Sequence, residues 1–213
     1  MNLVQGVANM KVLDPLSVSI ENAGELSIPE ERKAILNTLI DYIRSGTQSG
    51  KEVNLNFICT HNSRRSQFSQ IWAQVAAYYY GVDINSFSGG VEVTEFNLRA
   101  VASVERFGFE VEKEGDVNPR YSVKYSKRAQ PLICFSKIFD DPSNPKENFA
   151  AVMTCSHADE NCPFIPGAEA RIPVRYDDPK TFDGTDLESS KYDERSLQIA
   201  AEMFYVFSKV STF

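Results

Sequence analysis

The sequence predicts an α/β fold: a three-layer domain with a four-stranded parallel sheet, helices on both faces, and an N-terminal helical extension. Short apolar segments alternate along the chain with longer segments in which apolar residues recur every three or four positions. Strands alternating with helices favour a parallel sheet covered on both faces. The 213 residues suit one domain with an extension, which we place at residues 1–50, followed by a main domain at 51–213.

The extension is expected to contain one helix. Residues 1–27 show no regular pattern, whereas residues 29–44 carry apolar side chains at helical spacing. Pro29 suits the first helical turn, and the two glutamates after it suit the positive end of a helix. The glycine-containing polar segment 46–50 is predicted to be a linker.

The main domain supplies the sheet and the remaining helices. Because the carboxyl ends of parallel strands form the ligand-binding edge of such a sheet, Cys59, Cys155 and Asp178, which follow predicted strands, are expected at that edge. Residues 109–125 are charged and turn-rich and are predicted to form a surface hairpin or loop, followed by a short apolar run at 131–135. The predicted strands are 53–58, 84–88, 149–154 and 170–174, and the predicted helices are 66–80, 94–107 and 193–210.

Composition limits the classes of function. The net charge of −7 argues against a nucleic-acid partner. An apolar run of about 18 residues and a secretory leader are both missing from the sequence, so we expect a cytoplasmic protein without a membrane partner. The chain has four cysteines, Cys59, Cys134, Cys155 and Cys162, and in that compartment functionally important cysteines tend to be catalytic or metal-binding rather than paired in structural disulfides.

The most specific motif runs from Cys59 to Ser66: a cysteine, five residues, an arginine and a serine, between a predicted strand and a predicted helix. A loop of this length can turn its backbone N–H groups toward one centre, where an oxyanion binds at the helix N-terminus. Arg65 can bind two oxygens of that anion, Cys59 becomes the nucleophile as a thiolate, and Ser66 donates a hydrogen bond to the sulfur. The alternative is a buried structural cysteine with two solvated arginines. The predicted oxyanion-binding residues are Thr60, His61, Asn62, Ser63, Arg64 and Arg65.

This segment resembles the phosphate loop of low-molecular-weight protein tyrosine phosphatases and of the thioredoxin-coupled arsenate reductases built on the same fold. The resemblance covers Val53 to the C-terminus, and leaves out residues 1–50 and the excursion near 110–130. It implies that residues 51–213 form a low-molecular-weight phosphatase-like catalytic domain. His61 departs from the usual small residue or glycine, and it either narrows the loop mouth or faces solvent.

A second cysteine pair separates the two families. Cys155 to Pro163 is similar to the reductase pattern Cys-Ser-x-Ala-Asp-x-Asn-Cys-Pro, which implies a disulfide shuttle between Cys155 and Cys162, regenerated by a thioredoxin-like reductant. The alternative is that Cys155 packs at a strand end and Cys162 is incidental. A zinc site is weaker, because only His61 and His157 add to the cysteines. Cys134 has no partner motif and is expected to be a small buried side chain.

Asp-Asp-Pro occurs twice, at 140–142 and 177–179. The second copy follows the fourth predicted strand, where the resembled families carry an acid, so Asp178 is predicted to protonate the leaving oxygen. No tightly bound cofactor is expected. The resemblance also suggests a potassium ion near Asn62 and Ser88, but Gln70 stands where an acidic ligand is expected.

Three functions remain open from the sequence. The first is reduction of arsenate to arsenite through Cys59, Cys155 and Cys162. The second is hydrolysis of phosphotyrosine or a small phosphomonoester, although Lys180 and Thr181 stand where these phosphatases carry aromatic residues. The third is a protein that senses an oxyanion or oxidant through Cys155 and Cys162.

Overall fold

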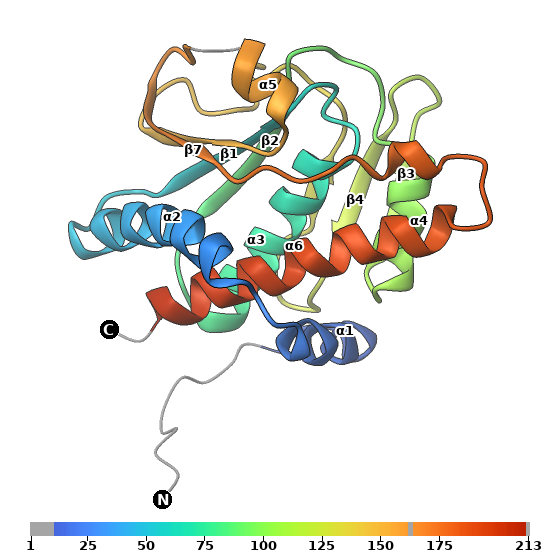
Figure 1. Cartoon of the computed structure of the whole chain (residues 1–213), viewed down its shortest axis with the longest axis horizontal. Helices are drawn as coiled ribbons and strands as arrows, with labels where there is room; N and C mark the ends of the chain where they lie inside the picture. Colours follow the sequence, from blue (N-terminus) through green and yellow to red (C-terminus); the bar gives the residue numbers. More distant parts are fainter. Residues whose placement is uncertain (1–10, 162–163, 212–213) are drawn as a thin grey trace, which may run out of the picture.

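The computed structural model describes residues 11–161 and 164–211, and at its centre lies a four-stranded parallel sheet (Figure 1). The strand order is β2-β1-β6-β7, with β1 at Asn54–Cys59, β2 at Asn85–Gly90, β6 at Phe149–Met153 and β7 at Ala168–Pro173. Every residue of β1 and β6 is buried, which fits their central places in the sheet. The predicted fold class is confirmed.

The two faces of the sheet are covered differently. On one face, Leu55 and Phe57 of β1 join a large apolar core with α3 (Arg65–Tyr80) and α6 (Glu188–Val210). On the other face, Ile58 and Met153 join a smaller cluster that includes Ala158 of α5 (Ser156–Asn161). The segment after β6, which carries the motif that starts at Cys155, thus contains a short helix at residues 156–161.

The N-terminal segment contains two helices, α1 (Asp14–Glu25) and α2 (Glu30–Gln48), and both pack against α6. The expectation that residues 1–27 are irregular was wrong for residues 14–25, where Leu16, Ile20 and Ala23 are buried at helical spacing. The predicted linker at 46–50 was also wrong in part, since α2 continues to Gln48 and its Gly46 packs against Val53. Division of the chain at residue 50 stays a prediction.

The excursion after α4 (Leu98–Arg106) forms a small antiparallel sheet in the order β3-β4-β5, with β3 at Glu110–Glu114, β4 at Arg120–Lys124 and β5 at Leu132–Cys134. A hairpin was expected here, and the apolar run 131–135 adds its third strand. Helix α4 begins four residues later than predicted, because the Asn97 side chain caps it by accepting from the Arg99 N–H.

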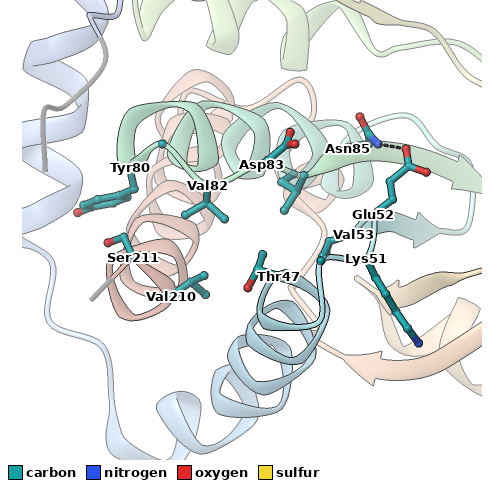
Figure 2. A pocket seen from close by; sticks show the side chains of 13 residues that line it. Thr47, Lys51, Glu52, Val53, Tyr80, Val82, Asp83, Asn85, Val210 and Ser211 are labelled. Atoms are coloured by element: carbon teal, nitrogen blue, oxygen red, sulfur yellow. Dashed lines mark hydrogen bonds between the residues drawn. The ribbon is translucent and has the colours of Figure 1, made fainter. Parts of the chain in front are cut away.

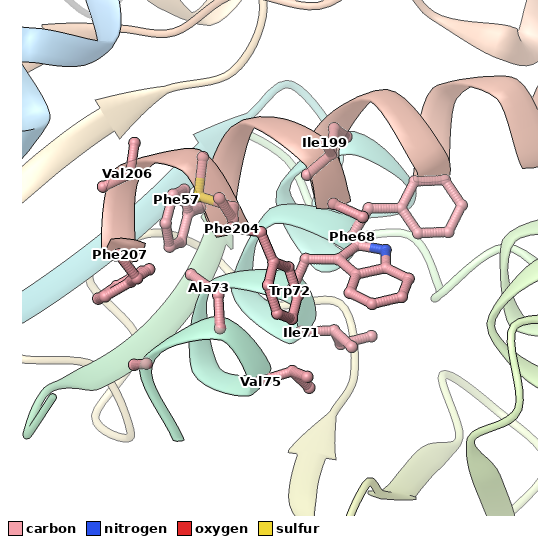
Figure 3. Close-up of a cluster of buried hydrophobic side chains, with 14 of the residues drawn as sticks. Phe57, Phe68, Ile71, Trp72, Ala73, Val75, Ile199, Phe204, Val206 and Phe207 are labelled. Carbon is pink, nitrogen blue, oxygen red and sulfur yellow. The ribbon is translucent and has the colours of Figure 1, made fainter. Parts of the chain in front are cut away.

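Aromatic packing joins α3 to α6 in the main core. Trp72 is fully buried; its indole N–H donates to Ser196 Oγ at 2.9 Å, and its ring meets Phe204 edge-on (Figure 3). These contacts fix α3, and therefore the loop that precedes it, relative to α6. Over the described residues, the helices are too short or too polar to cross a membrane.

Candidate active site

The loop between β1 and α3 presents its backbone in one orientation. The carbonyl groups of residues 60–64 all accept hydrogen bonds from surrounding groups, whereas none of the N–H groups of residues 60–64 donates to an acceptor in the described part of the chain. Amides that are left over in this way form a concave site for an anion at the start of a helix. The groups that hold the carbonyls are Val91 N, Glu92 N, Thr94 Oγ1, Ser136 Oγ, Gln67 Nε2, Asn97 N and Phe68 N.

Backbone conformation at two positions makes this loop possible. Asn62 has φ of 46°, in the left-handed region, which turns the chain within the loop. Gly90, at the end of β2, lies so close that a Cβ there would meet Asn62 N at 2.7 Å and Thr60 O at 2.8 Å. The glycine therefore lets β2 support the loop from behind.

Asn62 also directs the hydroxyl of Ser66 toward Cys59. Its Oδ1 accepts from the Lys137 N–H at 3.0 Å, so its Nδ2 faces Ser66 and donates to Oγ at 2.8 Å. Ser66 Oγ lies 3.0 Å from Cys59 Sγ. Because Ser66 already accepts from Asn62, its own proton is available for a hydrogen bond to the Cys59 sulfur.

Arg65 lies at the mouth of the loop. Its Nη1 donates to the Tyr176 carbonyl at 3.1 Å, and its Nη2 donates to Asp178 Oδ2 at 2.7 Å. Its Nε is buried without a partner among the described residues, so a donor remains for an oxyanion. Arg65 and Asp178, predicted as anion ligand and acid, are thus brought together.

Arg64 has a different environment from Arg65. Its Nε donates to the Tyr192 hydroxyl at 2.8 Å, and its Nη2 lies 3.7 Å from Asp183. Tyr192 in turn donates to Asp183, and burial beside that carboxylate raises the pKa of Tyr192 to about 12. Sequence reasoning missed Tyr192 and Asp183, for which the chain offers no local motif. The part of Arg64 in oxyanion binding stays a prediction.

Thr60, His61 and Ser63 occupy the rest of the loop. Ser63 Oγ donates to the Glu95 carbonyl at 2.7 Å, which ties the loop to the segment before α4. His61 is half-buried, and its Nε2 lies 3.3 Å from Glu92. The His61 side chain, which replaces the small residue usual in the resembled families, therefore lies along the rim of the loop and reaches Glu92, just after β2.

Cys155 faces the same loop from the neighbouring strand. Its thiol is buried and lies 3.5 Å from Thr60 Oγ1, which is also 3.3 Å from His157 Nδ1. The Ala158 N–H donates to the Cys155 sulfur at 3.4 Å. Cys59 ends β1 and Cys155 follows β6, its parallel neighbour, so both cysteines lie at one edge of the sheet. The other shuttle residue, Cys162, lies outside the described residues.

Helix α5, which follows Cys155, is attached to the end of the sheet by one carboxylate. Asp159 Oδ1 accepts from Arg171 Nη2 at 2.6 Å, and Asp159 Oδ2 accepts from Arg175 Nε at 2.7 Å. The Asp159 side chain is only 8% exposed, so both arginines are needed to balance its charge.

Cys134 lies apart from these thiols, at the end of β5. It is fully buried, and this burial raises its pKa to about 12. The expectation of a small buried side chain is confirmed. Cys59, Cys134 and Cys155 all carry free thiols.

The first copy of Asp-Asp-Pro lies in an exposed turn, where Asp141 accepts from the Ser143 N–H at 2.9 Å. A pocket of about 560 Å³ lies at the opposite end of the sheet, near Thr47, Val53 and Val210 (Figure 2). Neither the turn nor the pocket contains a cysteine, so the loop after β1 remains the candidate site for thiol chemistry.

A potassium ion beside the loop would need side-chain oxygens that do not already accept a hydrogen bond. Asn62 Oδ1 is already occupied by the Lys137 N–H, but Ser88 Oγ, Gln70 Oε1 and Gln67 Oε1 are buried without a partner among the described residues. Neutral oxygens are ligands of a kind that a monovalent cation accepts, and these three belong to α3 and β2. A group of three His, Cys, Asp or Glu side chains that could hold a metal is not found within residues 11–161 and 164–211. Potassium therefore stays a prediction.

Comparison with curated proteins finds a consistent set of relatives, although no family model matches the chain. Arsenate reductase 1 of Staphylococcus saprophyticus is 30% identical over 148 residues, which cover 70% of this chain and 92% of that protein. The arsenate reductase of Halalkalibacterium halodurans is 26% identical over 132 residues, 62% of this chain and 78% of that protein.

Comparison with solved structures finds a low-molecular-weight phosphotyrosine phosphatase from Vibrio cholerae O395, at a TM-score of 0.48 and 13% identity, covering 73% of this chain and 94% of that one. A YwlE mutant from Bacillus subtilis aligns at a TM-score of 0.47 and 12% identity, covering 74% and 97%.

Proposed function

The chain belongs to the arsenate reductase family, and we propose that it reduces arsenate to arsenite through Cys59, Cys155 and Cys162. The observation that carries the proposal is the meeting of two thiols at one loop. Cys59 begins the loop whose amides find no acceptor among residues 11–161 and 164–211, and Cys155 contacts Thr60 of the same loop. A phosphatase needs the first thiol only.

The reaction begins with arsenate in the loop. The amides and Arg65 bind its oxygens, and the Cys59 thiolate attacks arsenic while Asp178 gives a proton to the oxygen that leaves as water. Cys155 then attacks Cys59 Sγ. A disulfide forms, the sulfur–arsenic bond breaks, and its electron pair stays on arsenic, which leaves as arsenite.

Regeneration follows by thiol–disulfide exchange. Cys162 attacks Cys155 Sγ and releases the Cys59 thiolate, so the disulfide moves to Cys155–Cys162. A thioredoxin-like dithiol then reduces that disulfide and becomes oxidised. A cytoplasmic location follows from this cycle, because the three thiols must start reduced.

The test separates the first turnover from the following ones. We expect Cys162→Ser to release about one arsenite per protein and then stop, in an assay coupled to thioredoxin. Cys134→Ala is the matched control and should keep full turnover. Steady-state activity of Cys162→Ser at the wild-type rate would refute the relay. Parallel assays with thioredoxin, glutaredoxin and mycothiol-type systems identify the reductant.

A second candidate is hydrolysis of an aryl phosphate. The contact of Arg65 with Asp178 favours it, because this pair could bind a phosphoryl group and protonate its leaving oxygen without Cys155. Comparing kcat/KM for arsenate and for an aryl phosphate decides between them. A larger value for the aryl phosphate would make the hydrolase the main activity.

A further inference from the structure

We propose that Arg32, on α2 of the N-terminal segment, is a positioning residue for the Arg65–Asp178 pair, acting through Glu202 and Tyr176. The inference deepens the proposed function, on which it rests. It gives a role to a part of the chain that lies outside the resemblance to phosphatases and reductases.

The first step is a buried ion pair between α2 and α6. Arg32 Nε donates to Glu202 Oε1 at 2.8 Å, and Arg32 Nη2 donates to Oε2 at 2.7 Å. The side chains are 14% and 3% exposed. A carboxylate buried to this degree on α6 needs a cation beside it, and the bidentate geometry of Arg32 fixes its orientation.

The second step joins this pair to Tyr176, which follows β7. The Tyr176 hydroxyl donates to Glu202 Oε2 at 2.7 Å, and the Arg32 guanidinium lies 4.7 Å from the centre of the Tyr176 ring. Burial and the neighbouring carboxylate raise the pKa of Tyr176, so its hydroxyl stays protonated and keeps donating to Glu202. The ring is therefore held at its tip by Glu202 and on its face by Arg32.

The third step reaches the site through the backbone of Tyr176. Its N–H donates to the Thr154 carbonyl at 3.1 Å, and its own carbonyl accepts from Arg65 Nη1 at 3.1 Å. Two residues later, Asp178 accepts from Arg65 Nη2. The segment that places both partners of Arg65 is thus anchored by a side chain that α2 and α6 hold.

The consequence is that the loop mouth depends on α2. Without Arg32, the Glu202 carboxylate loses its counterion and Tyr176 loses the fixed acceptor of its hydroxyl. The 176–178 segment can then shift, and Arg65 no longer has a fixed orientation for two anion oxygens. Catalytic geometry is sensitive to displacements of this kind.

The experiment measures oxyanion binding without relying on turnover. Inorganic phosphate should protect Cys59 from iodoacetamide, and the protection curve gives a Kd for the full-length protein. We expect Arg32→Met/Glu202→Gln, which removes both buried charges, to raise this Kd about tenfold, and Tyr176→Phe to raise it about threefold. Both variants should also lower kcat for arsenate.

Arg44→Met is the matched control, because Arg44 also joins α2 to α6, through the Lys209 carbonyl. It should keep the wild-type Kd, which a general loosening of α2 would not allow. An unchanged Kd in Tyr176→Phe overturns the positioning role even if the double variant fails to fold. Absence of phosphate protection in the wild type would instead contradict the proposed function itself.

Discussion

The hydroxyl of Ser66 makes a contact whose loss can be measured. Asn62 donates to it, and its oxygen lies 3.0 Å from the Cys59 sulfur. We expect Ser66→Ala to slow single-turnover arsenite release on the order of tenfold, because a hydrogen bond to a charged group is lost. Quenched-flow measurement at neutral pH checks this.

Ser69→Ala offers a control for that substitution on the same helix, since Ser69 Oγ donates only to the Arg65 carbonyl within α3. Equal rates in Ser66→Ala and wild type would show that the hydroxyl does not stabilise the attacking sulfur.

In contrast to Cys59, Cys134 is expected to be an unreactive thiol. With a pKa raised to about 12 by burial, roughly 10⁻⁴ of it is thiolate at pH 8. We expect iodoacetamide to modify Cys59 in the folded protein and to leave Cys134 unmodified, as read by mass spectrometry of peptides. In 8 M urea both should react. Equal labelling in the folded state would contradict the burial of this side chain.

The sequence alone predicted the loop and its main residues, but it did not predict the side chains that hold them in place. The motif from Cys59 to Ser66 predicted a loop with a strand before it and a helix after it, and the structure has this arrangement. It could not predict that Asn62 orients Ser66 or that Tyr192 holds Arg64, because those partners depend on segments 75 and 128 residues away. The functional roles of these residues stay predictions until tested.

At the scale of elements, α5 carries the most specific prediction. Asp159 holds this helix against Arg171 and Arg175 at the end of β7. Movement of the disulfide from Cys59 to Cys162 requires the segment after Cys155 to rearrange, since a disulfide needs its two Cα atoms within about 7 Å. We expect Asp159→Asn to raise amide hydrogen exchange in residues 156–161 about tenfold, by weakening two charge-assisted contacts.

Glu160→Gln is the control for α5, because Glu160 is exposed on the same helix. It should leave exchange at the wild-type rate. If both variants exchange alike, the two arginines do not hold α5.

Element boundaries show why pattern reading succeeds for some segments and fails for others. The buried strands β1 and β6 were predicted within one residue, because each is a short segment rich in apolar residues that leads into a polar loop. Helix α1 was missed because its buried face is only Leu16, Ser19, Ile20 and Ala23, with a low apolar content around it. Its stability comes from packing on α6, which the local sequence does not reveal.

At the scale of the whole molecule, the N-terminal helices and the sheet share one apolar core. Leu36 of α2 belongs to the same cluster of buried side chains as Trp72 of α3 and Phe57 of β1. If the chain unfolds as one unit, a defect in α2 lowers the stability measured anywhere in that cluster. The single tryptophan of the chain, Trp72, is a natural reporter, because it lies on α3 and not on α2.

We expect Leu36→Ala to lower the free energy of unfolding by about 3 kcal/mol, since it removes a fully buried leucine and leaves a cavity. Urea titrations followed by Trp72 fluorescence and by circular dichroism should give the same shifted midpoint. Ile35→Ala, at a position 38% exposed on the same helix, should cost less than half as much. A tryptophan transition that stays at the wild-type midpoint while circular dichroism shows α2 melting earlier would mean that residues 1–50 fold as a separate unit.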